Sequence, residues 1–251
     1  MTLRTLTSLP NGGVRRRQRG LTLVELMIAV AISLFVMLAF VTVFINMKRA
    51  FTSQDQLSQL QDNERLALSM ITSTVQGAGY FPDPLTATAS DATNLGSIAS
   101  NSSHAAMLAG QSVVGTSGTS PASDTLTTRH VAGPVVGTVV DDVADCFGVR
   151  NTGATKKKVV NTFSVNTSNE LVCTVDGGAS TAVVSNVQSL VVRYLVKDAS
   201  GNGQYLAASA VADWSQVVAV RITLTFLNPY DRTAGGVAWT QIINLMNRTS
   251  T

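Results

Sequence analysis

Charged residues are scarce in this 251-residue chain: they make up 13% of it, whereas about 25% is usual for a soluble domain. Together with 45% apolar residues, this excludes a disordered acidic or basic regulator and indicates a membrane-embedded segment. Two cysteines are too few for a disulfide scaffold, although they can form one bridge. His104 and His130 show no metal-ligand spacing with each other or with the cysteines, so neither a metal nor another cofactor is expected.

Acidic residues are absent from the first 20 positions, which contain five arginines: Arg4, Arg15, Arg16, Arg17 and Arg19. Without these arginines the chain has 13 basic and 15 acidic residues, so its excess of positive charge belongs to a short N-terminal tag. The remainder of the chain is therefore not expected to bind nucleic acid.

Residues 21–45 form a run without proline or glycine, and Glu25 is its one charge. About 20 apolar residues span a bilayer, whereas the apolar core of a cleaved secretory signal has about 7–15. An uncleaved membrane anchor is the simplest alternative, and the arginines before the run predict a cytoplasmic N-terminus. A lone carboxylate in such a run needs either a cationic partner or contact with the membrane surface.

The segment Arg19-Gly20-Leu21-Thr22-Leu23-Val24-Glu25-Leu26 resembles the class III signal of type IV prepilins. The resemblance implies that prepilin peptidase cleaves after Gly20 and methylates the new N-terminus, Leu21. It also implies that Glu25 pairs with the N-terminal amine of a neighbouring subunit and sets the axial register of assembly. Leu21 departs from the family's commonest residue, phenylalanine, but large apolar residues occur there, so methylation is still expected.

A helical pattern continues beyond the apolar run, with Leu57, Leu60, Ala67, Ile71 and Val75 on one face. Glu64 interrupts this stripe, and Gly77-Ala78-Gly79 followed by two prolines ends the pattern. We expect a helix over residues 22–76 whose second half packs on a globular domain. The resulting division is a leader at 1–20, a transmembrane and assembly helix at 21–46, an amphipathic half at 47–79 and a head at 80–251.

The head changes to a period of two, which is typical of strands. Strands are predicted at 125–131, 135–140, 159–165, 170–175, 187–197, 218–226 and 237–245. The Ser/Thr-rich stretch 86–125 is predicted to be a loop with little regular structure. Short strands joined by turns indicate a mainly antiparallel sheet laid against the long helix, an α+β fold.

Several motifs in the mature chain resemble the PilW family of minor type IV pilins: 61–67, 77–81, Cys146-Phe147-Gly148, Cys173, Arg193-Tyr194 and 213–221. This implies the type IV pilin fold, an inner-membrane precursor with a periplasmic head, and entry into a pilus near its tip. The implied partners are prepilin peptidase, other minor pilins, the major pilin, inner-membrane lipid and a tip adhesin. A GspJ-like pseudopilin of type II secretion and a membrane-tethered adhesin or binding domain remain alternatives.

Cys146 and Cys173 both fall in the part expected to face the oxidising periplasm, so a disulfide is predicted, with two buried thiols as the alternative. Asp198–Gly203 begins like a calcium loop but lacks the twelfth-position glutamate, so an ordinary turn is favoured. The lysines at 156–158 are expected in a solvated loop, as are Asp141, Asp142 and Asp145. The chain carries no nucleophile-elbow, zinc-protease or phosphate-loop motif, so no catalysis is expected.

Overall fold

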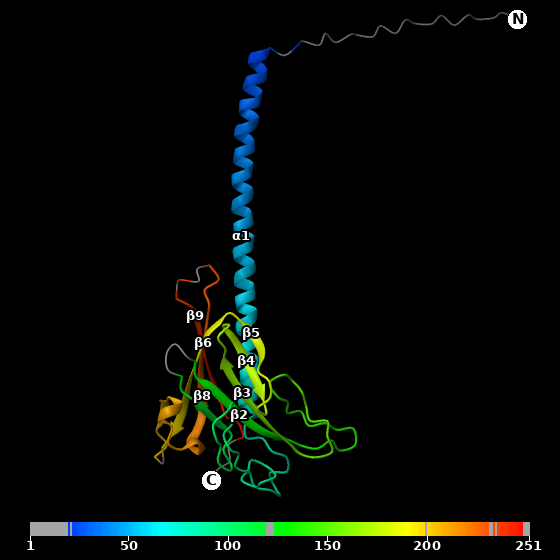
Figure 1. Cartoon of the computed structure of the whole chain (residues 1–251), viewed down its shortest axis with the longest axis vertical. Helices are drawn as coiled ribbons and strands as arrows, with labels where there is room; N and C mark the ends of the chain where they lie inside the picture. The colour runs from blue at the N-terminus through cyan, green and yellow to red at the C-terminus, as the bar shows by residue number, and fades with distance from the viewer. Residues whose placement is uncertain are drawn as a thin grey trace, which may run out of the picture. The chain divides into compact units, whose positions relative to one another are not determined.

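The computed structural model describes residues 20, 22–118, 123–198, 200–230, 233 and 235–247. The chain divides into two compact units, Met1–Thr52 and Ser53–Thr251. One long helix, α1 (Leu23–Gly77), contributes residues to both units (Figure 1). Its bounds confirm the helix predicted over 22–76, and no glycine or proline interrupts it before Gly77.

The first unit consists, in its described part, of Gly20, Thr22 and α1 up to Thr52. Every one of these residues is exposed. The exposed side chains include bulky apolar ones such as Phe35 (74%), Phe40 (71%) and Phe44 (69%). α1 is long and apolar enough to cross a membrane, and none of its most apolar window is buried.

The second unit contains two antiparallel sheets, where the sequence predicted one. The first sheet has the order β1 (Val113–Thr116), β2 (Thr125–Ala132), β3 (Lys157–Val165), β4 (Glu170–Val175), β5 (Thr181–Ser185). The second has the order β7 (Gly203–Leu206), β6 (Val187–Lys197), β8 (Val217–Phe226), β9 (Val237–Asn244). Two short 3-10 turns, η1 (Ala208–Ala210) and η2 (Trp214–Gln216), lie between β7 and β8. The combination confirms the predicted α+β class.

Most predicted strands lie within one residue of their observed bounds, but the strand predicted at 135–140 is wrong. Only an isolated bridge joins Val136 to Val139 there, and both side chains are 70% exposed. Pro134 at its start and Gly137, whose φ is +63°, do not allow an extended ladder. The predicted loop 86–125 also needs correction, because it contains β1.

Besides β1, two further strands, β5 and β7, were not expected from the sequence. β5 follows β4 through a tight turn in which Asp176 and Gly177 both have positive φ, at +53° and +74°. The Gly178 amide closes this turn by donating to the Val175 carbonyl at 2.9 Å. An Asp-Gly pair after a predicted strand is a strong hairpin signal, so this part of the fold was readable from the sequence.

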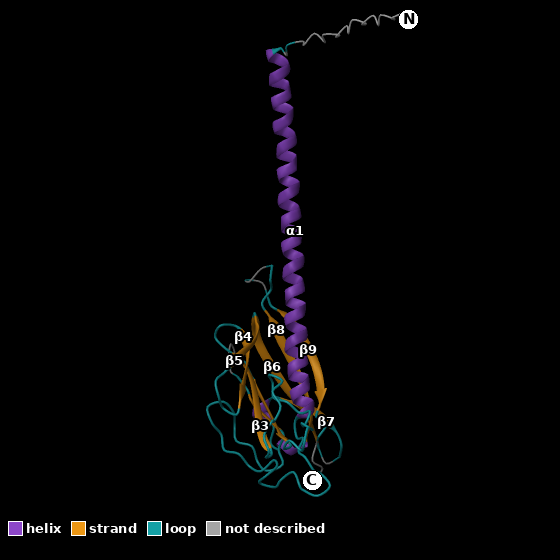
Figure 2. Ribbon diagram, turned by 90° about the vertical axis from the view of Figure 1, so that its right-hand side faces the viewer, coloured by secondary structure: helices purple, strands orange, loops and turns teal. Residues whose placement is uncertain are grey.

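The C-terminal half of α1 and both sheets share one apolar core. The helix contributes Leu60, Ala67, Ile71 and Val75, which the sequence placed on one face. Leu57 was predicted to continue this stripe, but it is 42% exposed. Glu64 lies half-buried at the edge of the stripe, and its desolvation raises the pKa of the carboxyl group. Figure 2 shows this half of α1 running beside β9.

The end of α1 is held by the backbone around it. Gly79 follows the helix with a φ of +83°, and its amide donates to the Arg129 carbonyl at 2.9 Å. A Cβ atom at this position would lie 2.2 Å from the carbonyl oxygen of Asn247. Glycine is therefore required here both for the left-handed backbone and for the close approach of a second chain segment.

The Ser/Thr-rich region after α1 is ordered by a buried arginine on β2. Arg129 is 3% exposed, and its guanidinium donates to the carbonyls of Gly96 (2.6 Å), Leu95 (2.9 Å), Leu108 (2.6 Å) and Gln111. No described carboxylate pairs with this guanidinium, and its burial lowers the pKa of Arg129 to about 10. Leu95 and Met107 are buried at 1% each. This region therefore packs against the sheet, although it has little regular structure.

Candidate processing and assembly site

The start of α1 is closed by a reciprocal pair of hydrogen bonds between Thr22 and Glu25. The Glu25 amide donates to Thr22 Oγ1 at 3.3 Å, and the Thr22 amide donates to Glu25 Oε2 at 3.0 Å. The Thr22 hydroxyl adds a third bond to Oε2 at 3.1 Å. Because α1 begins at Leu23, Thr22 is the N-cap and Glu25 the third helical residue, which is the geometry of a capping box.

The capping box gives Glu25 a local role that the sequence analysis missed. The signal was present as Thr22-x-x-Glu25 directly before an apolar helix. A carboxylate offers about four lone-pair sites, so Glu25 can keep its bonds from Thr22 and still accept a donor from another chain. The structure thus adds a function to Glu25 without removing the expected one.

The expected cleavage point lies immediately before this cap. Gly20 is exposed and no atom lies within 4 Å of the position that a Cβ would take. Leu21, the expected methylation site, lies outside the described residues. Gly20 itself is therefore exposed at the expected cleavage position and has no side chain to obstruct a peptidase.

Beyond the cap, α1 exposes apolar side chains on all sides of the helix as far as Phe51. The only described charges between Leu23 and Phe51 are Glu25, Lys48 and Arg49. A helix that is apolar all round needs lipid or other protein around it, because water would leave this surface unburied. This segment can therefore both sit in a bilayer and pack against like helices.

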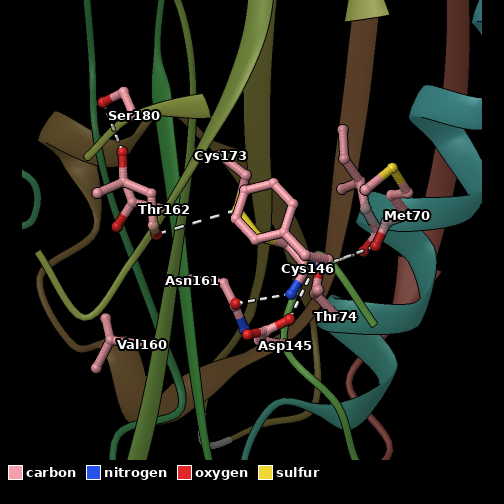
Figure 3. The surroundings of a disulfide bond; sticks show 12 residues. Met70, Thr74, Asp145, Cys146, Val160, Asn161, Thr162, Cys173 and Ser180 are labelled. Atoms are coloured by element: carbon pink, nitrogen blue, oxygen red, sulfur yellow. Dashed lines mark hydrogen bonds between the residues drawn. A yellow bond between two sulfur atoms is a disulfide. The ribbon is translucent and has the colours of Figure 1, made fainter. Parts of the chain in front are cut away.

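The predicted disulfide between Cys146 and Cys173 is present (Figure 3). Cys173 lies in the middle of β4, and Cys146 lies in the loop before β3, where its amide donates to Asn161 Oδ1 at 2.9 Å. Both cysteines belong to the core cluster that also contains Ile71 of α1. The bridge therefore ties the 141–148 loop to the first sheet where that loop approaches the helix.

The acidic residues of this loop have structural partners. Asp141 accepts hydrogen bonds from the Gly133 amide at 2.7 Å and from the Tyr80 hydroxyl at 3.2 Å. Asp145 Oδ1 accepts from the amides of Phe147 and Val149, both at 2.9 Å. Only Asp142, in an ion pair with Arg150 at 3.3 Å, fits the predicted solvated carboxylate. Asp141 and Asp145 shape the loop, which corrects that expectation.

The lysines at 156–158 are not in a solvated loop. Lys157 and Lys158 open β3, and Lys158 Nζ donates to the Ala92 carbonyl. Lys156 Nζ donates to Asn94 Oδ1 at 3.3 Å and lies 3.9 Å from Asp83 Oδ2. Lys156 and Lys158 therefore attach the segment after α1 to the first sheet, whereas Lys157 is exposed on β3.

The other polar candidates have ordinary structural surroundings. Asp198 Oδ1 accepts from the amides of Ser200 (2.9 Å) and Asn202 (2.8 Å), which makes residues 198–202 the turn between β6 and β7. His104 Nδ1 lies 2.8 Å from the Ala105 carbonyl oxygen. Within the described ranges, no three metal-ligating side chains gather at one place.

The Nε2 atom of His130 is buried and has no hydrogen-bond partner among the described residues. His130 is 1% exposed, and burial lowers its pKa to about 4. Thr128 Oγ1 and Asn161 Nδ2 are also buried without a described partner, and these two residues are paired across β2 and β3. Since Thr128 and His130 are two residues apart on one strand, the three side chains share a face of the sheet.

Comparison with known proteins agrees with the N-terminal geometry. The chain matches the prokaryotic N-terminal methylation motif over residues 15–41. No curated protein and no solved structure matches the chain. The motif covers four of the five N-terminal arginines (all but Arg4), Gly20, the capping box and the exposed apolar helix as far as Val41.

The motif and the fold together indicate a structural subunit of the type IV pilin-like class, which includes pseudopilins. The motif carries a class III signal and implies processing by prepilin peptidase and assembly with other pilins. The long apolar helix and the antiparallel sheets fit the α+β fold of that class. They also fit a precursor anchored in a membrane that later joins a filament.

Proposed function

We propose that this protein is a minor type IV pilin of the PilW family that helps to prime pilus assembly and enters the filament near its tip. It is made as an inner-membrane precursor with its N-terminus in the cytoplasm and its head in the periplasm. Residues 1–20 are the leader, 21–46 the membrane and assembly helix, 47–79 the amphipathic half and 80–251 the head. Its partners are prepilin peptidase, the major pilin, other minor pilins and a tip adhesin.

The observation that carries this proposal is the order of three features at the N-terminus. The methylation motif at 15–41 contains a cleavable glycine, a capping box follows it, and a helix with an exposed apolar surface comes next. A simple membrane anchor needs only the third feature. A subunit that must be released from its leader and packed among like helices needs all three.

Cleavage after Gly20 would place a positive amine two peptide units before the helix begins. We propose that this amine, on Leu21 and methylated, binds Glu25 of the adjacent subunit. In a low-dielectric surrounding an ion pair is worth far more than in water, so docking is favoured in one axial register. The capping box supports this by holding the carboxylate at the helix start through Thr22.

The test measures incorporation into filaments for three variants in cells with an active pilus system. Glutamine keeps the hydrogen bonds of a capping box but has no charge, whereas alanine loses both. If Glu25 sets the register, Glu25→Gln and Glu25→Ala should reduce incorporation alike, and Thr22→Val should reduce it less. Quantitative blotting of sheared filaments against whole cells, at equal membrane levels, gives the answer.

Three results would count against the proposal. If Glu25→Gln incorporates like the wild type while Glu25→Ala does not, Glu25 acts only as a cap. If mass spectrometry of the protein from these cells finds an intact Met1 rather than an N-methylated Leu21, processing after Gly20 does not occur. A processed protein that is absent from sheared pili but present in a secretion pseudopilus would point to the GspJ-like alternative.

A further inference from the structure

The second sheet ends in a long strand with an unprotected edge. β9 pairs with β8 alone, and no described hydrogen bond other than those to β8 involves its backbone. It is eight residues long and contains no charged residue and no proline. Natural proteins protect such edges with charges, prolines, bulges or shortness, because an open edge pairs readily with other chains.

The other described sheet edges have this protection. β1 and β7 have four residues each, and β5 has five and joins β4 through a break in register. Shortness and a break in register are two of the ways in which natural sheets discourage an edge from pairing with another chain. β9 is therefore the place on the described head where a strand can be added.

A groove lies beside this edge, between β9 and the second half of α1. It has a volume of about 440 Å³. Its strand side is lined by Gln241 of β9, and its helix side is lined by Leu68, Ser69, Thr72, Ser73 and Gln76, with the charged pair Glu64 and Arg65 at the N-terminal end. The small side chains at 69, 72 and 73 leave room for a backbone between helix and strand. At one end of the helix wall, Asn247 Nδ2 donates to the Gln76 carbonyl at 3.1 Å. The Thr72 hydroxyl is buried without a partner among the described residues.

We propose that β9 binds an extended segment of a different protein, which pairs with it through backbone hydrogen bonds and lies along this groove. This inference rests on the proposed function, since it makes the head a docking point for another subunit of the assembly. The segment that fits has about eight uncharged residues with apolar side chains at alternate positions. Its inward side chains meet Leu68 and Thr72, and its outward ones extend the face that carries Ile242, which is 56% exposed.

A second copy of this chain is a poor donor for this edge. Its own short edges cannot cover eight residues, so two copies could pair only through β9 on both sides. Pairing of identical edges in a closed dimer runs antiparallel, because the two-fold axis reverses one strand. β9 runs in the same direction as the adjacent half of α1 (Figures 1 and 2). Antiparallel β9 pairing would therefore point the two Ser53–Gly77 segments in opposite directions. Two subunits that enter a filament from the same membrane have these segments pointing the same way, so they cannot pair in this manner.

The experiment places a photoreactive benzophenone amino acid at Ser73 of the full chain, in cells that assemble the filament. Gln241→Lys puts a charge in the groove, and Ile242→Lys puts one on the exposed face of β9, where folding does not depend on it. Thr181→Lys on β5 is the matched control, because Thr181 is exposed on an edge of the other sheet. Hydrogen exchange of the β9 amides is measured in assembled material and in purified, detergent-solubilised monomer.

We expect Ser73 to crosslink to an uncharged, extended segment of another protein. Both β9 lysine variants should lower the crosslink yield about tenfold, and β9 amides should exchange about tenfold more slowly in the assembly, as for a newly formed strand pair. Crosslinks only to another copy of this chain, equal yields for the β9 variants and Thr181→Lys, or unchanged β9 exchange would each overturn the inference.

The same samples separate this inference from the proposed function. If the processed protein is found in sheared filaments but Ser73 gives no lysine-sensitive crosslink, strand addition is wrong and the pilin function stands. If the crosslink and the β9 protection occur in membranes while no protein enters filaments, the filament role is wrong and strand addition stands.

Discussion

The two halves of α1 differ in where their apolar side chains are placed. From Leu23 to Thr52 every side chain is exposed, including large ones such as Phe35. From Ser53 to Gly77 the helix exposes polar residues and buries a narrow stripe of Leu60, Ala67, Ile71, Thr74 and Val75 in the core of its own head. The apolar side chains of the first half can be buried only by lipid or by other chains, whereas those of the second half are buried in the core of the protein's own head.

This difference shows how one continuous helix can serve two purposes. In proteins most helical stability comes from packing of one face rather than from propensity, and the second half of α1 has that packing within its chain. The first half obtains it only from lipid or from neighbouring helices. Substitutions in the second half should therefore change the stability of the head, whereas those in the first half should change packing in the membrane or the filament. The predictions below are given in order of decreasing effect.

The largest effect is expected from the buried charge in the head. Arg129→Ala removes the donor for four carbonyl groups that hold residues 95–111, and it should lower the free energy of unfolding by about 3–5 kcal/mol. Urea denaturation followed by fluorescence measures this, and limited proteolysis should cut first within 95–111. Arg150→Ala is the control, since its exposed pair with Asp142 is worth at most about 1 kcal/mol. An equal loss of unfolding free energy in the two variants would show that Arg129 does not hold residues 95–111.

A matched pair of substitutions compares the two halves of α1 directly. Ile71→Ala should destabilise the head by about 2–5 kcal/mol, because Ile71 is fully buried in the core. Phe35→Ala should leave head stability unchanged and act instead on packing in the membrane or the filament. The head stability of both variants is measured by urea denaturation of the mature protein in detergent. A loss of head stability in Phe35→Ala would show that the first half is not independent of the core.

The head should also lose stability as the pH falls, because His130 is buried in its neutral form. Its pKa is about 4 in the folded protein, against about 6.5 when unfolded, so the unfolded chain binds more protons between these values. The stabilising contribution is complete above pH 6.5 and declines toward pH 4. We expect about 2 kcal/mol less stability at pH 5 than at pH 7.5.

The control for this pH dependence is His130→Gln, which removes the titrating ring. Its unfolding free energy should change less between pH 7.5 and pH 5 than that of the wild type, whatever its absolute stability. Parallel curves for the two proteins would assign the pH dependence to other groups.

The smallest effect is expected when the first half of the helix is removed. A chain beginning at Ser53 retains the buried stripe of α1 and both sheets, so its unfolding free energy should lie within about 0.5 kcal/mol of the full protein. It should also remain in solution without detergent. Thermal and urea unfolding of the shortened chain test this, and failure to fold would mean that residues before Ser53 support the head.

Some features of the fold were accessible because they depend on neighbouring residues in the chain. The strands at 170–175 and 187–197 have their predicted bounds. In 187–197 burial alternates along the strand, which is the pattern of one buried face, whereas 170–175 is a short apolar run buried on both faces. The capping box of Thr22 and Glu25 and the Asp176-Gly177 hairpin are equally local, because residues at most three positions apart in the chain specify each of them. The strand expected at 135–140 failed because Pro134 and Gly137 outweigh its valines.

By itself, the sequence determined the helix, the α+β class and a disulfide, because these follow from periodicity, composition and the small number of cysteines. The leader at residues 1–20 stays a prediction. Only the tertiary structure decided that the strands form two sheets, that Arg129 holds the Ser/Thr-rich region, and that Asp141 accepts a hydrogen bond from the Tyr80 hydroxyl. Nor could the sequence indicate that β9 borders a groove along α1. Those features depend on contacts between residues tens of positions apart, and a buried polar group is recognisable only once the fold brings its partners around it.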